Sequence, residues 1–415
     1  MMLDKSKGSL ALCGALIVVY FSFSACNTPA VPTEKPTPSM TYGDDLSFLQ
    51  KHAEVVVLAD ADSQAQVVVS PRKQGRVLTS TSGGDSGPSY GWINRELIAS
   101  GERQDHINVF GSEDRFWLGP EGGQYSIYFE PESPFDLEHW HVPAPIDWDP
   151  FRVVLQEHDR IVFEQDMELV NYSGTRFNVD VSREVRLLGH REISDRLGET
   201  PSSVVAYESV NRITNRGEQA WTKERGLLSI WILGMYNPSP ATTVVIPYLE
   251  GSEEEHGPIV NAAYFGDVPP SRLVIDNGVV FFRGDGEYRS KIGFTSWRSA
   301  PNFGSYDADN GVLTLIQYFV ADEGAPYVNS MWELQSEPYA GDVINSYNDG
   351  PPESGAKPLG PFYELETSSP AAELEPGKTL THTHRILHLQ GIELNRIAIA
   401  AFGRSLEEVR NVFGS

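Results

Sequence analysis

Short runs of β-branched and aromatic residues follow one another from residue 53 to the C-terminus, separated by Gly, Pro, Asn and Asp. Apolar and polar residues alternate clearly in 177–185, which predicts a strand with one buried and one wet face. Many such runs at close spacing indicate antiparallel sheets. Because the runs show no internal repeat and no break in composition, the sequence predicts one large all-β antiparallel sandwich rather than a propeller.

The expected strands lie at 54–58, 65–69, 124–129, 160–164, 177–185, 203–213, 226–233, 243–248, 272–276, 279–283, 291–297, 312–320, 328–334, 360–367 and 380–390. Few helices are expected: one at 44–51 and one at 405–413, which Ser405 is placed to cap. Segment 339–361 is rich in Gly, Pro, Asn and Asp, so it is predicted to be a surface loop, and long loops often border a site.

The N-terminus has two lysines, an apolar stretch and then small residues before Cys26, which is the order of a secretory signal. This pattern resembles the lipobox of bacterial lipoproteins, which implies lipid on Cys26 and a protein that is anchored rather than spanning. Asn27 follows, and by the same resemblance it implies the outer membrane of a Gram-negative cell envelope. The alternatives are an ordinary signal peptide or an N-terminal membrane anchor. Residues 27–42 are predicted to be a Pro/Thr-rich tether, and 43–415 a single domain.

The chain contains 32 Lys and Arg against 57 Asp and Glu, a formal net charge of −25. Long-range repulsion then argues against nucleic acid or anionic polymers as partners, whereas neutral sugars and cations are compatible. Cys13 leaves with the predicted signal and Cys26 is predicted to carry lipid. The mature domain therefore depends on its core and not on disulfides.

Four short motifs occur in a characteristic order: Gln-Gly-Arg-Val at 74–77, Asn-Arg-Ile-Thr-Asn at 211–215, Tyr-Glu-Leu-Glu-Thr at 363–367 and Leu-Glu-Pro-Gly at 374–377. This order resembles the galactose-mutarotase-like (aldose 1-epimerase-like) superfamily. The resemblance implies a supersandwich of antiparallel sheets with a carbohydrate site on its concave face. It also implies that Glu366, the glutamate of Leu-Glu-Thr, is the general base at the anomeric hydroxyl.

The chain also departs from the epimerase pattern. The epimerase segment that carries the general-acid histidine corresponds to 227–234, which contains Trp231 and no histidine. The Asn-Arg and His-Gly-Gly motifs of the epimerases are missing as well. The chain therefore looks closer to uncharacterised lipoproteins of this superfamily. Glu364 lies two residues before Glu366 and thus on the same face of the strand, so the sequence leaves open which carboxylate enters the cleft.

Residues 110–149 gather three tryptophans, two histidines and several carboxylates. Such a set suits sugar rings, because their C–H faces stack on indole and their hydroxyls need fixed polar partners. The predicted catalytic residues are Glu366 as base and His139 or His141 as acid. The predicted substrate-binding residues are Arg115, Trp117, Glu121, Trp140, Trp231, Glu364 and His384. The alternative is that each tryptophan is only a core anchor.

No cofactor is predicted, because the chain has no phosphate loop, dinucleotide fingerprint or Gly-x-Ser-x-Gly turn. A divalent metal is the alternative. Its ligands would come from two pairs that each face one way on an extended strand, His139-x-His141 and His382-x-His384, with Glu113, Glu364 or Glu366 completing the shell.

The leading hypothesis is a cell-envelope protein that binds a sugar in a mutarotase-like cleft and, if it is catalytic, transfers a proton at a sugar carbon or anomeric hydroxyl. The first alternative is a glycan-binding lipoprotein without turnover, which the missing histidine favours. Further alternatives are a polysaccharide lyase or hydrolase on the same fold and an envelope scaffold with a buried Trp/His cluster. The sequence leaves the oligomeric state open.

Overall fold

The computed structural model describes residues 40–199, 201–353 and 355–414, and their strands form three antiparallel sheets. The ten-stranded sheet has the spatial order β11 (Leu273–Asp276), β12 (Val279–Arg283), β10 (Thr242–Pro247), β14 (Asn302–Asp307), β15 (Val312–Tyr318), β18 (Thr379–Gln390), β8 (Ser203–Asn215), β7 (Arg176–Leu187), β6 (Arg160–Val170) and β5 (Arg152–Gln156). The five-stranded sheet has the order β13 (Ser290–Thr295), β16 (Asp342–Asn348), β17 (Tyr363–Ser368), β9 (Ser229–Tyr236) and β4 (Arg115–Gly119). The three-stranded sheet has the order β1 (Val56–Ala59), β2 (Gln66–Ser70) and β3 (Arg76–Thr81).

The helices are short and peripheral. They are α1 (Tyr42–His52), α2 (Arg95–Ser100), α3 (Ala144–Asp147), α4 (His190–Leu197), α5 (Glu253–His256), α6 (Leu394–Phe402) and α7 (Leu406–Asn411), with 3-10 turns η1 (Pro71–Lys73) and η2 (Gly84–Ser86). Capping boxes at Thr41–Asp44 and Ser405–Glu408 begin α1 and α7, so both predicted helices are confirmed.

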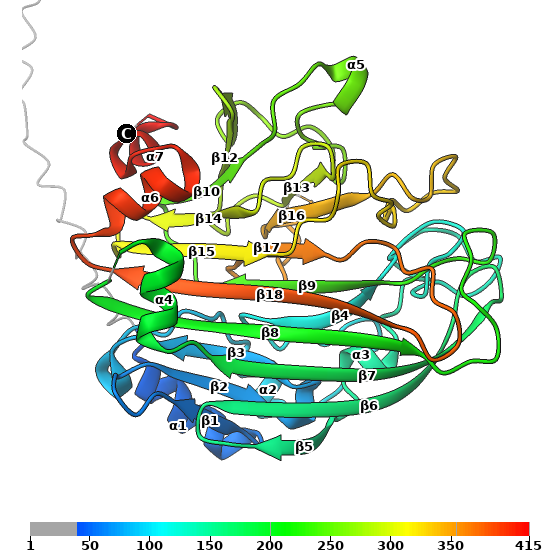
Figure 1. Cartoon of the computed structure of the whole chain (residues 1–415), viewed down its shortest axis with the longest axis horizontal. Helices are drawn as coiled ribbons and strands as arrows, with labels where there is room; N and C mark the ends of the chain where they lie inside the picture. The colour runs from blue at the N-terminus through cyan, green and yellow to red at the C-terminus, as the bar shows by residue number, and fades with distance from the viewer. Residues whose placement is uncertain (1–39, 200, 354, 415) are drawn as a thin grey trace, which may run out of the picture. The chain divides into compact units, whose positions relative to one another are not determined.

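The ten-stranded sheet carries an apolar layer on each face, because apolar residues on its central strands point alternately to opposite sides. On β18, Ile386 packs into the main core, which the five-stranded sheet shares through residues such as Leu365. Leu387 and Leu389 point the other way and pack with residues of α6 and α7. Figure 1 shows these two helices beside β14 and β15. The core between the sheets therefore fixes the position of the five-stranded sheet.

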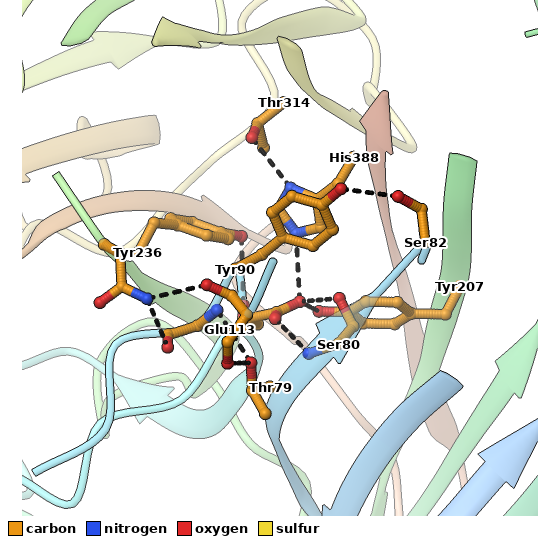
Figure 2. A network of polar contacts seen from close by, with 12 residues as sticks. Thr79, Ser80, Ser82, Tyr90, Glu113, Tyr207, Tyr236, Thr314 and His388 are labelled. Carbon is orange, nitrogen blue, oxygen red and sulfur yellow. Dashed lines mark hydrogen bonds and ion pairs between the residues drawn. The ribbon is translucent and has the colours of Figure 1, made fainter. Parts of the chain in front are cut away.

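A buried hub of hydrogen bonds connects the three sheets (Figure 2). The carboxylate of Glu113, just before β4, accepts from Ser80 Oγ of β3 at 2.8 Å, Tyr207 OH of β8 at 2.8 Å and His388 Nε2 of β18 at 3.1 Å. The other ring nitrogen of His388 lies 2.9 Å from Thr314 Oγ1 of β15. These three donors reach Oε2 of Glu113, and Ser80 N donates to its Oε1 at 2.5 Å. Both carboxylate oxygens therefore have partners, so the hub stabilises the layers instead of leaving a buried charge unpaired.

The predicted fold class, a large antiparallel sandwich with few short helices, is confirmed. Strands β4, β5 and β14 were not among the expected strands, and three segments with a stated expectation differ from the structure. Segments 124–129 and 328–334 contain no strand. Their aromatic residues, such as Tyr128, fill the core from loops, because β-propensity partly reports burial rather than ladder pairing. Segment 339–361 is not all surface loop, since it contains the fully buried β16. The polar side chains of β16 find partners, as in the bond from Asn348 Nδ2 to Tyr288 O at 3.0 Å.

Residues Met40–Ser415 form one compact unit. The predicted signal, Cys26 and residues 27–39 of the predicted tether lie outside the described residues. In the part of the chain that the structure describes, no helix is long and apolar enough to cross a membrane.

Candidate functional site

One face of the five-stranded sheet gathers most of the predicted site residues. Directly opposed residues of antiparallel strands share a face, and so do residues two apart on one strand. Arg115 lies opposite Leu233, which lies opposite Glu366. The neighbouring rows follow the same rule, so one set of side chains shares what we call the site face. It comprises Arg115, Trp117, Trp231, Lys291, Asn345, Glu364 and Glu366.

The site face points away from the ten-stranded sheet. Thr367 alternates with Glu366 on β17 and therefore points to the opposite side. Its hydroxyl lies 2.8 Å from His382 Nε2 and 2.8 Å from His384 Nδ1, both on β18 of the ten-stranded sheet. Burial lowers the pKa of His382 to about 3 and that of His384 to about 4, so both imidazoles are neutral.

Glu366 is the most completely enclosed carboxylate of the site face, with no exposed surface. Its Oε2 accepts from Lys291 Nζ at 3.0 Å and from Trp231 Nε1 at 2.9 Å. Its Oε1 is buried and accepts no hydrogen bond of normal geometry from the described residues, although the carboxyl group of Glu364 is close enough to interact with Glu366. An unpaired buried carboxylate oxygen costs free energy unless a ligand or water supplies a donor.

Glu364 and Arg115 form a second hydrogen-bonded pair on the site face. Arg115 Nη2 donates to Glu364 Oε1 at 3.2 Å, and Arg115 also stacks over Trp117, with Cζ 4.1 Å from the ring centre. Burial, and then the neighbouring Glu366, raise the pKa of Glu364 to about 8, although Arg115 opposes the shift. Glu364 is therefore largely protonated at neutral pH.

Glu121 enters the same cluster from the loop after β4. Burial raises its pKa to about 7, and Glu366 adds to the shift, while Lys291 and a hydrogen bond from Trp332 oppose it. For Lys291 itself, burial favours the neutral amine, but Glu366, Glu121 and Glu364 together raise its pKa. The ammonium group thus lies among three carboxyl groups, of which Glu366 is the hydrogen-bonded partner.

A small polar cavity lies beside Lys291 and Trp231. Its volume is about 10 Å³, with Ser229, Tyr264 and Asp342 among its lining residues. Tyr264 OH donates to Asp342 Oδ2 at 2.5 Å, and burial raises the pKa of both groups. Ser229 Oγ, on the site face next to Gly119, is buried without a partner in the described chain. The cavity has room for about one water molecule.

Two loops, which we call the cover, close the cluster: 120–142 and 324–341. Their main connection is a pair of hydrogen bonds, in which Gln124 Nε2 donates to Gln335 O at 2.9 Å and Gln335 N donates to Gln124 Oε1 at 2.9 Å. Trp332 stacks on Trp140, with ring centres 5.8 Å apart, and its side chain forms a hydrogen bond with the carboxyl group of Glu121. A ligand larger than water therefore needs the cover to open.

A sequence model of one protein family, described as a family of unknown function (DUF6786), matches residues 40–413. The chain belongs to the DUF6786 family. A search of curated proteins found no match.

Solved structures similar to this DUF6786 protein include the Slr1438 protein from Synechocystis sp. PCC 6803. It is 14% identical, with a TM-score of 0.50 and coverage of 82% of this chain and 96% of that chain. A galactose mutarotase-like protein from Lactobacillus casei is 10% identical, with a TM-score of 0.45 and coverage of 81% and 100%. A GalM/aldose epimerase homologue from C. elegans is 9% identical, with a TM-score of 0.45 and coverage of 82% and 100%. At 14% identity, the similarity to the Slr1438 protein shows a shared fold alone.

The structure brings some predicted site residues together and leaves others apart. Those that meet in the cluster are Arg115, Trp117, Glu121, Trp231, Glu364 and Glu366, and Trp140 joins them through the cover. His384 lies behind the site face, bonded to Thr367. His139 pairs with Asp136 at 2.7 Å, and this partner raises its pKa. His141 is exposed and stacks on His106.

The residues of the metal alternative do not converge. Glu113 is hydrogen-bonded within the hub, and His382 and His384 both lie within hydrogen-bond distance of Thr367. Within 40–199, 201–353 and 355–414, no group of three or more His, Cys, Asp or Glu side chains is placed to hold a metal ion. Lys291 provides the positive charge at the centre of the carboxylates.

Sequence reasoning missed Lys291, Trp332, Asn345, Asp342 and Tyr264. Lys291 begins an expected strand and alternates with the apolar Ile292 and Phe294, so its parity is that of the polar face and gave no signal of a buried ion pair. Asn345 and Asp342 were hidden because their segment was interpreted as loop. Trp332 and Tyr264 come from irregular segments, where no periodicity exists to show which way a side chain points.

Proposed function

We propose that this DUF6786 protein binds a sugar on the site face and interconverts its anomers by proton transfer. The observation that carries the proposal is the unpartnered Oε1 of Glu366, which is buried beside an indole and an ammonium group. A sugar hydroxyl supplies the missing donor, and the ring can lie against the aromatic side chains of the cluster.

In this proposal Glu366 is the base and Glu121 is the acid. Glu366 Oε1 takes the proton of the anomeric hydroxyl. The bond from the anomeric carbon to the ring oxygen then breaks, and the ring oxygen takes both the electron pair and a proton from Glu121. Reclosure from the other face reverses these transfers and returns both protons. The raised pKa of Glu121, about 7, supports this role, because it keeps the group protonated near neutral pH.

This assignment differs from the sequence-based prediction for the acid. His139 and His141 stay candidates only if the cover rearranges, since their partners lie outside the cluster. Lys291 and Trp231 act as positioning residues, because they hold Oε2 of Glu366 and leave Oε1 for the substrate. Lipid on Cys26 would keep this site outside the cytoplasm, in the cell envelope, where free and polymeric sugars are available.

The test adds neutral monosaccharides and oligosaccharides to the mature chain and follows tryptophan fluorescence and anomer exchange by NMR. We expect a fluorescence change and exchange faster than in buffer. Glu366→Gln should abolish the catalysed exchange, whereas Glu130→Gln, at an exposed glutamate of the cover, should leave it unchanged. Absence of binding across neutral and acidic sugars contradicts the proposal.

A second candidate is sugar binding without turnover. The observation that favours it is the lack of a histidine in 227–234, together with the partners that hold His139, His141 and His384 outside the cluster. A sugar that binds the chain, and whose anomers exchange no faster than in buffer at every pH, supports this second function over the first.

A further inference from the structure

A second cavity, which we call the open cleft, lies away from the residues of the site face. Its volume is about 400 Å³, within the range of small-molecule sites. The turn between β1 and β2, the residues after β3, α4 and the first residues of β8 line it. No residue that the sequence analysis assigned to a site lies in these segments.

The floor of the open cleft is apolar and one wall is hydroxylic. Leu188, Ile193 and Ala206 are buried at the floor. On the wall, Ser203 Oγ donates to Ser82 Oγ at 2.9 Å, and Ser82 Oγ lies 2.8 Å from Tyr90 OH. The protons of these hydroxyls run from Ser203 to Ser82, to Tyr90 and on to Gln390, so the wall has free lone pairs that can accept hydrogen bonds from the hydroxyls of a ligand.

The hydroxyl wall is held from behind by the hub. Tyr90 OH donates to Gln390 Oε1 at 3.1 Å, and its ring stacks on His388 with centres 4.3 Å apart. Figure 2 shows Ser82 bonded to Tyr90 at the edge of the network centred on Glu113. Because these side chains are already ordered, a ligand that binds to the wall costs them little conformational entropy.

The charges of the open cleft limit what it can bind. Asp60 is a carboxylate and His190 an imidazole on its lining, and no Lys or Arg is among the described residues that line it. Anions are therefore disfavoured. A neutral ring with hydroxyls on its edge and C–H groups on its face matches both the wall and the floor. We propose that the open cleft is a second carbohydrate site, for a neutral sugar.

This proposal does not rest on the site face, because it needs neither proton transfer nor Glu366. Calorimetric titration of the mature chain with galactose, maltose, cellobiose and glucuronate tests it, together with crystals soaked in the tightest of them. Ser82→Ala and Ser203→Ala should weaken binding of a neutral sugar about tenfold when combined. Ser89→Ala is the matched control, because its hydroxyl forms an equivalent pair with Thr79 at 2.7 Å outside the cleft.

We expect density for the neutral sugar against Leu188 and Ser82, affinity retained in Glu366→Gln, and no binding of glucuronate to the cleft. A sugar found only at the site face, with affinity lost in Glu366→Gln and kept in the serine variants, overturns the second site and leaves the proposed function standing. A sugar in the cleft with none at the site face supports the second site and contradicts the proposed function. Failure of all three neutral sugars to bind overturns the proposal of a second site.

Discussion

A protein that acts on a sugar needs reactive groups and enough space for the sugar. In this protein the site face has the reactive groups, and the open cleft has the space. The site face has three carboxyl groups and an ammonium group around about 10 Å³ of space, whereas the open cleft has about 400 Å³ and mostly hydroxyls. Buried charges perturb one another strongly only where water is excluded. The difference teaches that the cover affects reactivity. By excluding water, it raises the pKa values of Glu121 and Glu364, which an open site would leave near normal.

The largest effect is expected from Lys291→Met. This change leaves the buried Glu366 without its ionic partner, and breaking such a pair costs about 3–5 kcal/mol of unfolding free energy. Urea denaturation measures it. Lys223→Met is the matched control, because Lys223 and Glu373 form an exposed pair at 3.8 Å, worth about 0–1 kcal/mol. Equal losses in the two variants would show that enclosure adds nothing at the site face.

The next effect concerns Glu121→Gln. Loss of the acid should slow anomer exchange by about 10²–10⁴-fold. In the wild type the rate should fall as pH rises through about 7, since the acid must be protonated to act. The variant should lose this decline, and sugar binding to the open cleft should keep its affinity. An unchanged pH profile in the variant would exclude Glu121 as the proton donor.

A smaller effect is expected in the pH dependence of stability. The folded pKa of Glu364, about 8, lies above the ordinary value of 4.5 for a glutamate, so folding takes up a proton between these pH values. Its contribution to stability is therefore greatest below about pH 4.5 and is lost as pH rises toward 8, at up to about 1.4 kcal/mol per pH unit. Chemical denaturation of the wild type and of Glu364→Gln from pH 5 to 8 checks this. The variant should show the shallower slope, and a steeper slope would contradict the raised pKa.

The smallest effect is expected from Gln335→Ala, which removes the side-chain bonds that Gln335 makes inside the cover while keeping its backbone bonds to Gln124. Each hydrogen bond is worth about 0.5–1.5 kcal/mol net. Hydrogen exchange of 324–341 should become faster, making the site face more like the open cleft in access. Gln317→Ala, which breaks a bond to Asn302 on the ten-stranded sheet, is the control. Identical exchange in 324–341 for the two variants would mean that the Gln335 side chain does not hold the cover.

The sequence allowed prediction of the sandwich and of the face shared by Glu364 and Glu366, because side-chain direction on a strand has a period of two. That rule is local, so it works wherever a strand is recognised. It could not show which other strands lie beside β17. The row that joins Arg115, Glu366 and Asn345 depends on the register of strands far apart in the chain.

The cover shows the other limit of prediction. Residues 110–149 were expected to carry a site because of their aromatic and acidic content, and Glu121 and Trp140 do reach the cluster. His139 and His141 lie in the irregular segment after β4, where no period indicates the direction of a side chain. Their actual partners, Asp136 and His106, are set by local turns and loop contacts.

The hub described above has a consequence for the timing of folding. Glu113 and its partner His388 are 275 residues apart, and the bond between them joins the first part of the chain to the last long strand. A chain that emerges N-terminus first cannot complete this bond until almost all of it has appeared. If the protein is exported as proposed, this bond and the pairing of β18 with β8 and β15 form only after passage across the membrane. The same long-range hub that makes the finished sandwich rigid then delays its assembly until the chain has reached the compartment where it works.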